Sequence, residues 1–244
     1  YQPSPVRRVE IAKPDGGTRQ LGIPTATDSV IQQAIAQVLT HIFAPDFSEH
    51  SFGFRSGRHG HQPVKQVQSI IKEGRRFAVD VDLSKFFDRV NHDLLRAHLG
   101  DKVKDKRLLK LSKRYLRAGF IDNQFKGESR VGVPQGGPLS PLLANIMLDS
   151  LDKELEKRGH KFARYADDFT ILVKSQRAGE RVLRSISQYL QSRLKLVVNT
   201  DKSRVVKTNE SQFLGFTFKA NRIHWHPKTL LKFKQNVRKL TNRN

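Results

Sequence analysis

One stretch constrains the fold of this chain more than any other: residues 162–173, which read FARYADDFTILV. Apolar side chains on both flanks can form two short strands, and Ala166-Asp167-Asp168 between them is a compact polar break that can close a β-hairpin. Two adjacent carboxylates at a hairpin tip repel each other. Mg²⁺ would remove that repulsion, because it prefers carboxylate oxygen and keeps part of its water shell for a substrate phosphate. A merely solvated pair is the alternative, since Asp is a common turn residue.

Charge is the strongest global feature. The chain has 244 residues, with 45 Lys and Arg against 23 Asp and Glu, and a formal net charge of +22. The basic residues are spread along the whole chain, which favours a polyanionic partner such as nucleic acid over a disordered basic arm. A basic surface that only confers solubility is the alternative.

Other global features exclude several classes of protein. The chain contains no cysteine, which excludes a disulfide framework, a thiolate metal site and a cysteine nucleophile. No stretch approaches the ~18 apolar residues of a membrane span, and the first residues lack the apolar region of a secretory signal. We therefore expect an intracellular protein without membrane contact.

The N-terminal region predicts a basic hairpin followed by a glycine-rich loop. Residues 6–11 and 20–23 read as strands around the turn sequence PDGG at 14–17. Residues 51–61, SFGFRSGRHGH, contain three glycines and two arginines. Such a loop can bring backbone close to a phosphodiester, although a plain surface loop is an equal alternative.

Residues 77–82, FAVDVD, predict a strand with an unusual distribution of acids. Side chains alternate along a strand, so Ala78, Asp80 and Asp82 share one face and the Phe and Val residues share the other. Strands are usually depleted in Asp. The acidic face is therefore a candidate functional feature.

Apolar spacing predicts several amphipathic helices. One begins at Asp28, a good N-cap, and Ser84 can cap a single short helix, SKFFDRVNHDLL. Longer helices follow the turn at 133–138 and the hairpin at 162–173. A last helix from Pro227 is expected to turn its apolar residues (Leu230, Phe233, Val237, Leu240) inward and its lysines and arginines outward.

Six motifs occur in an order that resembles one known family. They are KPDGGTRQLGIPT at 13–25, SFGFRSGRHGH at 51–61, DLSKFFD at 82–88, GVPQGGPLSPLLANI at 132–146, YADD at 165–168 and FLGF at 213–216. Together they cover essentially the whole chain and resemble the reverse transcriptases encoded by group II introns, which also act as splicing maturases. The resemblance implies an α+β fold, the fingers and palm of a right-hand polymerase, with an antiparallel palm sheet backed by helices.

The resemblance also implies a division of the chain. Residues 1–75 would be the first part of the fingers, 76–98 the first part of the palm, 99–131 a fingers insertion, 132–226 the remaining palm and 227–244 the start of a thumb helix. Family members usually have an N-terminal extension and, after the last helix, a thumb and a DNA-binding region. We expect a fingers–palm fragment whose synthesis is weak and poorly processive.

Nucleotidyl transfer is the chemistry that the resemblance implies. Two Mg²⁺ ions, for which Mn²⁺ can substitute, need carboxylates from separate elements to stabilise the attacking and leaving oxygens. Asp82, Asp167 and Asp168 supply these carboxylates, and the carbonyl of Leu83 assists. Asp80 could point into the same site, but the family motif does not need it.

Further residues match family positions that contact the nucleotide or the primer. Phe87 would be a steric gate against a 2′-hydroxyl, although at least one of Phe86 and Phe87 must be an ordinary core aromatic. Gln135 would contact the templating or incoming nucleotide. The remaining matches are Lys13 and Arg19 at the triphosphate, Lys202 near the pyrophosphate, and Phe213, Leu214, Gly215 and Phe216 as the primer grip. Candidate RNA-binding residues are Arg7, Arg8, Arg55, Arg58, Lys228 and Lys232.

The function implied is an RNA-directed DNA polymerase that binds its intron RNA as a maturase and copies RNA into DNA for retrohoming. Its partners would be the intron RNA, an RNA template with a DNA primer, and dNTPs. The sequence does not show whether it forms a homodimer. We expect a cytoplasmic location, of bacterial or organellar type, in association with nucleic acid.

Three alternatives remain. A structural RNA-binding maturase would use the basic surface and need no polymerase chemistry. A retron-like reverse transcriptase shares YADD but typically carries an NAxxH block and a VTG segment, which are absent here, and a viral RNA polymerase would carry GDD at the hairpin.

Two histidine pairs, His59/His61 and His224/His226, are weak zinc candidates because no third and fourth ligand lies nearby in sequence.

Overall fold

The computed structural model describes residues 1–12, 17–122, 125–127 and 130–242. The chain divides into two compact units. The first comprises Tyr1–Ser48, Ser84–Leu151 and Tyr189–Val197, and the second comprises Glu49–Leu83, Asp152–Gln188 and Val198–Asn244. Helices α6 (Ser140–Lys157) and α7 (Gln176–Arg193) each begin in one unit and end in the other.

The second unit is built on a four-stranded antiparallel sheet. Its strand order is β6-β7-β3-β8, and the strands are β6 (Lys161–Tyr165), β7 (Asp168–Val173), β3 (Phe77–Val81) and β8 (Arg204–Lys207). Strands β6 and β7 form the predicted hairpin, with Tyr165 paired to Asp168 across a two-residue turn. The predicted antiparallel sheet is therefore confirmed.

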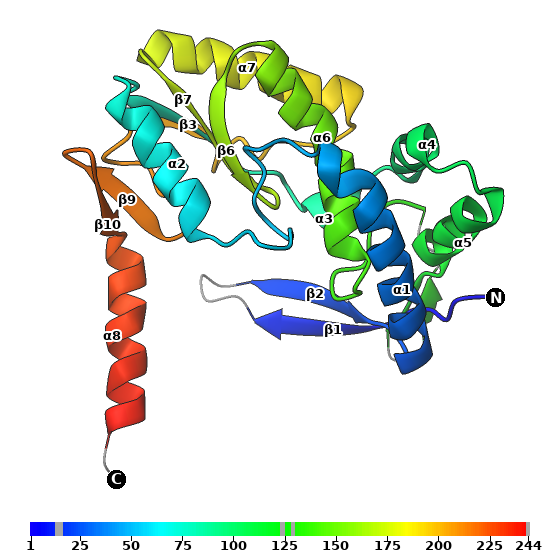
Figure 1. The fold of residues 1–244 in the computed structure, drawn as a ribbon. Helices are drawn as coiled ribbons and strands as arrows, with labels where there is room; N and C mark the ends of the chain where they lie inside the picture. The colour runs from blue at the N-terminus through cyan, green and yellow to red at the C-terminus, as the bar shows by residue number, and fades with distance from the viewer. Residues whose placement is uncertain (13–16, 123–124, 128–129, 243–244) are drawn as a thin grey trace. The chain divides into compact units, whose positions relative to one another are not determined.

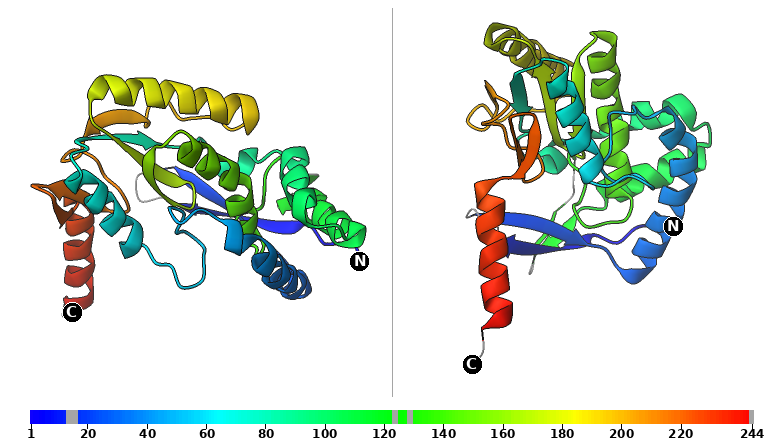
Figure 2. Two further views of the ribbon diagram at one scale, coloured as in Figure 1. Left: turned by 45° about the horizontal axis from the view of Figure 1, so that its top comes forward. Right: turned by 60° about the vertical axis from the view of Figure 1, so that its left-hand side comes forward.

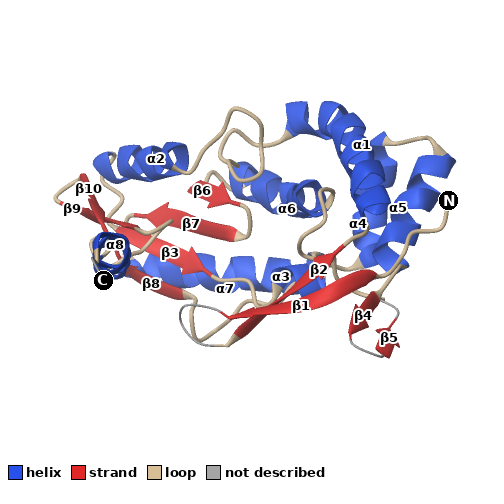
Figure 3. Ribbon diagram, turned by 90° about the horizontal axis from the view of Figure 1, so that it is seen from below, coloured by secondary structure: helices blue, strands red, loops and turns tan. Residues whose placement is uncertain are grey.

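Helices cover both faces of this sheet. Figure 3 shows α2 (His61–Lys72) on one side and α7 on the other. Val64, Val67 and Ile71 of α2 pack in one core with Ala78 of β3 and Leu172 of β7. On the opposite face, Gly179 of α7 lies so close to Val205 that a Cβ atom there would come within 2.4 Å of a Val205 methyl group. Side-chain alternation then places Asp80 on the face that α2 covers.

A second hairpin and the last helix complete this unit. Strands β9 (Phe216–Lys219) and β10 (Arg222–Trp225) form an antiparallel pair beside α2 (Figure 1). Helix α8 (Pro227–Thr241) then runs away from the rest of its own unit (Figure 2). No residue of α8 is buried, so the expectation that its apolar side chains point inward is wrong within the described chain.

The first unit contains the other four-stranded sheet, in the order β2-β1-β4-β5. Its strands are β1 (Val6–Ala12), β2 (Thr18–Ile23), β4 (Phe120–Asp122) and β5 (Phe125–Gly127). The β1–β2 pairing is antiparallel, which confirms the predicted basic hairpin, whereas β4 runs parallel to β1. The helices of this unit are α1 (Ala26–Phe43), the 3-10 helix η1 (Ala44–Asp46), α3 (Phe86–Arg89), α4 (His92–Lys102) and α5 (Lys106–Arg117). Among the described residues, no helix is long and apolar enough to cross a bilayer.

Two predicted helix starts were wrong. Helix α1 begins earlier than Asp28, because the Thr25 side chain accepts a hydrogen bond from the Asp28 backbone N–H and acts as the N-cap. The single helix expected from Ser84 is two helices. Lys85 has a left-handed φ of 49°, and Asn91 caps α4 by accepting hydrogen bonds from the two N–H groups of Asp93 and Leu94.

Candidate active site

Five carboxylates line one cavity in the second unit. Asp80, Asp82, Asp167, Asp168 and Asp201 line a space of about 630 Å³. The other lining residues include three cations and parts of two loops: Leu83, Lys202, Arg204, Gln212, Leu214, Gly215 and Lys228. The three aspartates identified from the motifs are therefore brought together by the fold, and Asp80 joins them.

Strand pairing explains why these side chains meet. Asp82 directly follows β3, while Asp167 lies in the hairpin turn and Asp168 opens β7. Because β3 and β7 are antiparallel neighbours, with Val81 opposite Phe169, the end of one strand meets the start of the other. Carboxylates from separate parts of the chain thus reach one edge of the sheet.

The backbone of Asp82 is held on both sides by the segment that follows α7. Its N–H donates to the Ser203 hydroxyl at 3.0 Å, and its carbonyl accepts from the Asn199 N–H at 2.8 Å. Leu83 extends this contact through a bridge to Val198. Neither Asn199 nor Ser203 was identified from the sequence, because one serine or asparagine in a loop carries no distinctive signal.

The local environment disfavours negative charge on this edge. Asp168 retains accessible surface, but the dense packing around its carboxyl group raises its pKa to about 7, and the charges of Asp80, Asp167 and Asp82 add to the shift. Burial also raises the pKa of Asp80. Hydrogen bonds from the Thr170 and Ser211 hydroxyls, at 2.9 and 3.0 Å, oppose that rise only in part.

A buried arginine holds the turn that carries Asp167. The Arg164 guanidinium donates to both carboxylate oxygens of Asp152, to the Ser51 hydroxyl at 2.7 Å and to the Ala166 carbonyl at 2.8 Å. Ala166 itself has a left-handed φ of 58°. Nothing in the sequence separates Arg164 from the many exposed basic residues.

The glycine-rich loop approaches the same turn. A Cβ atom on Gly53 would lie 2.2 Å from the backbone nitrogen of Ala166, so only glycine fits there without a shift. Within this loop, Arg55 donates to the Ser51 carbonyl at 2.8 Å, and Arg58 forms an ion pair with Glu49. The loop glycine thus serves close packing against protein backbone, whereas the sequence had suggested approach to a phosphodiester.

The FLGF segment also reaches the carboxylate cavity. Phe213 and Phe216 exchange two backbone hydrogen bonds of 2.9 Å, which makes a tight turn. Phe213 is buried in the core beneath α2, whereas Leu214 and Gly215 line the cavity. The Gly215 carbonyl accepts from the N–H of His226, at the start of α8. Of the four residues predicted to grip a primer, two are therefore placed at the cavity.

A separate cavity lies in the first unit. It encloses about 390 Å³ and is lined by residues that include Arg8, Gly22, Phe87, Arg130 and Gln135. Phe86 is buried in the core while its neighbour Phe87 is half-buried at the cavity, which separates the two aromatic roles that the sequence left open.

The proline-glutamine-glycine turn is docked on strand β2. The Gln135 carbonyl accepts a hydrogen bond of 2.6 Å from the Gly22 N–H. Gly136 has a φ of 121°, and a Cβ atom on it would lie 2.8 Å from the Gly22 carbonyl oxygen. These glycines permit close approach of two backbones, and Gln135 lies at the cavity.

The remaining predicted residues are more scattered. Arg7 and Arg19 are exposed on β1 and β2, whereas the Arg8 guanidinium lies 3.3 Å from the centroid of the Phe120 ring. Lys13 lies outside the described residues. Lys202 and Lys228 line the carboxylate cavity, and Lys232 is exposed on α8.

The histidine pairs have no supporting ligands. The His59 and His61 rings lie 5.8 Å apart, but within the described ranges no group of three or more His, Cys, Asp or Glu side chains is arranged to hold a metal ion by itself. This result also applies to the aspartates at the cavity. A metal bound there would need further ligands from water or substrate.

An antiparallel sheet that presents carboxylates from a strand end and from a hairpin tip defines the palm of a right-hand nucleic-acid polymerase. The sequence matches the family described as reverse transcriptase (RNA-dependent DNA polymerase) over residues 11–218. The chain therefore belongs to the reverse transcriptase family, whose members use divalent metal ions.

Individual relatives agree with this assignment. Protein YkfC of Escherichia coli K12 is 32% identical, over 91% of this chain and 68% of its own length. The group II intron-encoded protein LtrA of Lactococcus lactis is 29% identical, over 91% of this chain and 48% of its own length. The resemblance to group II intron-encoded proteins is thus confirmed.

A solved structure confirms the fold. Telomerase from Candida tropicalis, in complex with a TWJ fragment of telomeric RNA, superposes with a TM-score of 0.71 at 16% identity. The match covers 92% of this chain and 45% of the telomerase chain. The chain thus spans about half the length of the lactococcal relative and of this structure.

Proposed function

We propose that this chain forms the fingers and palm of a group II intron-encoded reverse transcriptase, which copies an RNA template into DNA from a DNA primer. The observation that carries the proposal is the convergence of Asp82, Asp167 and Asp168 on one cavity. The family match and the intron-encoded relative support the polymerase and the intron RNA as partner.

The donor set fits Mg²⁺. Mg²⁺ usually takes one or two carboxylates together with substrate phosphates and water, so protein ligands alone need not form a complete site. Asp82, Asp167 and Asp168 would hold two ions, with help from the Leu83 carbonyl, and Mn²⁺ could replace them. When bound, such ions activate the primer 3′-hydroxyl and stabilise the leaving oxygen.

The chain's own cations would complete the chemistry. Lys202, Arg204 and Lys228 line the cavity with the aspartates and can bind phosphate oxygens. Lys202 is the candidate proton donor to the departing pyrophosphate. Leu214 and Gly215, at the same cavity, would hold the primer end.

In the first unit, the half-buried ring of Phe87 would exclude a ribonucleotide, and Gln135 would contact the base. Lys13 and Arg19 would bind the triphosphate. The expected limits of fingers (1–75, 99–131), palm (76–98, 132–226) and thumb (227–244) are part of this proposal. The proposal also includes retrohoming as the biological outcome and six basic residues as intron RNA contacts: Arg7, Arg8, Arg55, Arg58, Lys228 and Lys232.

A primer-extension assay tests the proposal. The full chain is incubated with an RNA template, a DNA primer, dNTPs and Mg²⁺, beside the variant Asp167→Asn. We expect extension by the wild type and none by the variant, with RNA affinity unchanged. RNA binding without extension by the wild type would overturn the polymerase and leave a structural maturase, which the basic composition alone would favour.

A further inference from the structure

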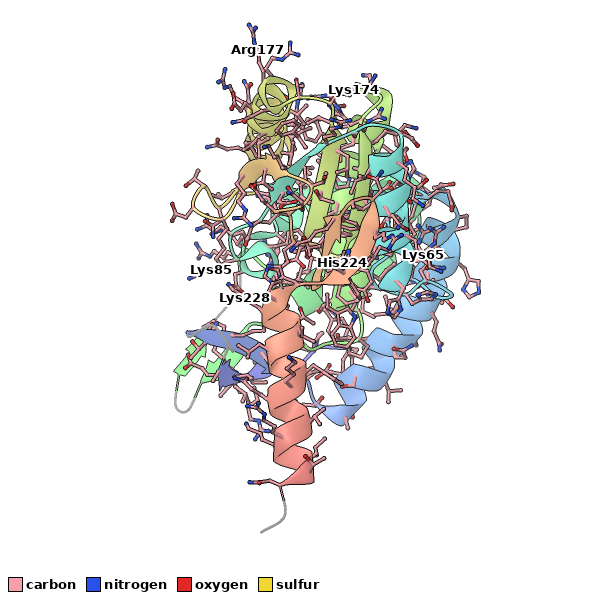
Figure 4. All side chains as sticks on the ribbon, turned by 90° about the vertical axis from the view of Figure 1, so that its left-hand side faces the viewer. Lys65, Lys85, Lys174, Arg177, His224 and Lys228 are labelled. Atoms are coloured by element: carbon pink, nitrogen blue, oxygen red, sulfur yellow. The ribbon has the colours of Figure 1, made fainter. Side chains whose placement is uncertain are left out.

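The second unit contains another cavity, at the end of the palm sheet opposite the carboxylate cavity. We call it the basic cavity. It encloses about 540 Å³ and is lined by Leu172 and Val173 at the end of β7 and by Lys161 at the start of β6. Asp168 is at the other end of β7, so the two cavities are separated by roughly 16 Å along that strand. Figure 4 shows Lys174, which lines this basic cavity, far from Lys228, which lines the carboxylate cavity.

The lining of this cavity is strongly basic. Its charged residues are Arg75, Arg158, Lys161, Lys174 and Arg181, with no Asp or Glu among them. Two of the arginines are paired: Arg75 with Glu73 at 3.0 Å, and Arg158 with Glu154 at 2.7 Å. For Lys161, Lys174 and Arg181, no carboxylate within the described parts of the chain lies at ion-pair distance.

The start of a long helix adds to this positive potential. Helix α7 has 18 residues, and its first turn contains no acidic residue. The Ser175 hydroxyl accepts from the Ala178 N–H, and Ala178 itself lines the cavity. The N-terminal end of a helix carries a partial positive charge that favours anions. Charged side chains and helix dipole therefore favour the same kind of ligand.

The rest of the lining indicates how the anion is recognised. The lining also includes the buried aliphatic residues Leu172, Val173 and Val182, and apart from His160 no lining residue has an aromatic ring. Aromatic rings are the usual platforms for stacked bases. With five basic side chains and a single aromatic ring, the cavity is therefore better suited to phosphate groups than to stacked bases.

We propose that this cavity binds backbone phosphates of an RNA strand, independently of base sequence, as an RNA contact separate from the carboxylate site. The inference rests on the proposed function for the identity of the polyanion. An acidic protein fits less well, because a stable protein interface buries ~800 Å² and about 20–30 residues on each partner, whereas this cavity is lined by 12 residues.

Salt-dependent binding tests the proposal. The pocket variant combines Lys161→Gln, Lys174→Gln and Arg181→Gln, all exposed side chains whose loss should leave the fold intact. The control variant combines Lys65→Gln, Lys219→Gln and Arg222→Gln, which remove the same charge from exposed positions that line neither cavity. Equal thermal midpoints would verify folding, and a labelled oligouridylate serves as the probe in a KCl series.

For single-stranded RNA, removing one phosphate contact reduces the slope of log affinity against log salt by ~0.7. We expect the slope of the pocket variant to fall by about 2 and its affinity near 0.1 M salt to fall at least tenfold. The control variant should change by less than half as much. Equal decreases in both variants, or none in the pocket variant, would overturn the proposal. So would tighter binding of polyglutamate than of oligouridylate by the wild type, which would indicate an acidic protein.

The polymerase can fail independently of this site. Asp167→Asn should abolish extension and leave the salt slope unchanged, whereas the pocket variant should extend a short primer–template at the wild-type maximal rate. If the wild type does not extend the primer, but the pocket variant binds RNA more weakly than the wild type, the polymerase is rejected and the second RNA site is retained. If the wild type extends the primer and the pocket variant binds RNA as tightly as the wild type, the second RNA site is rejected and the polymerase is retained.

Discussion

Arg164 and Asp152 form a bidentate ion pair from which solvent is excluded. Neither side chain has exposed surface, and the Arg164 Nε and Nη2 atoms lie 2.8 and 2.5 Å from the two carboxylate oxygens. The same guanidinium also donates to Ser51 and to the Ala166 carbonyl. One buried cation therefore connects α6, the start of the glycine-rich loop and the residue that precedes Asp167.

Removing only the cation should be severely destabilising. Arg164→Met leaves the Asp152 carboxylate buried opposite an apolar side chain, and breaking such a pair costs about 3–5 kcal/mol of unfolding free energy. Replacing both members by apolar residues, Arg164→Met with Asp152→Leu, should recover most of that stability. Urea unfolding of the single and double variants would measure both values, and a double variant no more stable than Arg164→Met would contradict this account.

The double variant also separates stability from site geometry. It lacks the donor to the Ala166 carbonyl, so the turn that carries Asp167 is less constrained. We expect primer extension to need a higher Mg²⁺ concentration although the protein is folded. A Mg²⁺ titration identical to that of the wild type would show that the ion pair does not position the turn.

Gly53→Ala should impair the site through packing alone. The added methyl group would meet the Ala166 backbone nitrogen at 2.2 Å, and overpacking of this kind typically costs about 1–3 kcal/mol. Because the displaced backbone belongs to the turn, extension should fall more than stability does. Gly60→Ala is the matched control in the same loop, since the nearest atom to its Cβ, on Leu214, is 4.0 Å away. Equal effects in both variants would count against a specific role for Gly53.

The parts of the fold that the sequence could predict are those encoded locally. The period-two pattern of FAVDVD and the polar break in FARYADDFTILV place Asp82, Asp167 and Asp168 at strand ends, and antiparallel pairing then brings those ends together. The family motifs identified the same residues. Local pattern and resemblance therefore sufficed to find the carboxylates.

The supporting contacts were not predictable, because they depend on which distant segments meet. A buried arginine and a surface arginine look the same in sequence, so Arg164 was not distinguished from the basic surface. The glycines of the loop indicated that its backbone closely approaches another group, but not which group. For Gly53 that group is the backbone of Ala166. The apolar face of α8 predicted burial, yet within the described chain its residues are exposed; Leu240 is 87% exposed.

The raised pKa of Asp168 predicts a pH-dependent stability in the absence of metal. Its folded pKa of about 7 exceeds the ordinary 3.8, so the folded state binds more protons between these values and the free energy of unfolding decreases as pH rises through that window. Asp168→Asn removes this dependence. Because Asp168 is accessible to water, solvent screens part of this effect. We expect the melting temperature of the variant to be about 2–4 °C higher than that of the wild type near pH 8 and the same near pH 4. Melting curves in EDTA would check this, and a difference that grows toward low pH would contradict the sign.

Phe87→Ala should relax sugar selection without disturbing the backbone around it. The Phe87 carbonyl accepts a hydrogen bond of 2.7 Å from the Val133 N–H, which the substitution leaves in place, while the ring that lines the cavity is removed. A steric contact of this kind discriminates by about 1–3 kcal/mol, so the preference for dNTP over rNTP should fall by about 10- to 200-fold in single-nucleotide incorporation. Phe86→Leu is the control: its ring is 2% exposed, so it should lower stability and leave sugar preference unchanged. A Phe87→Ala enzyme with wild-type discrimination would assign the gate to another residue.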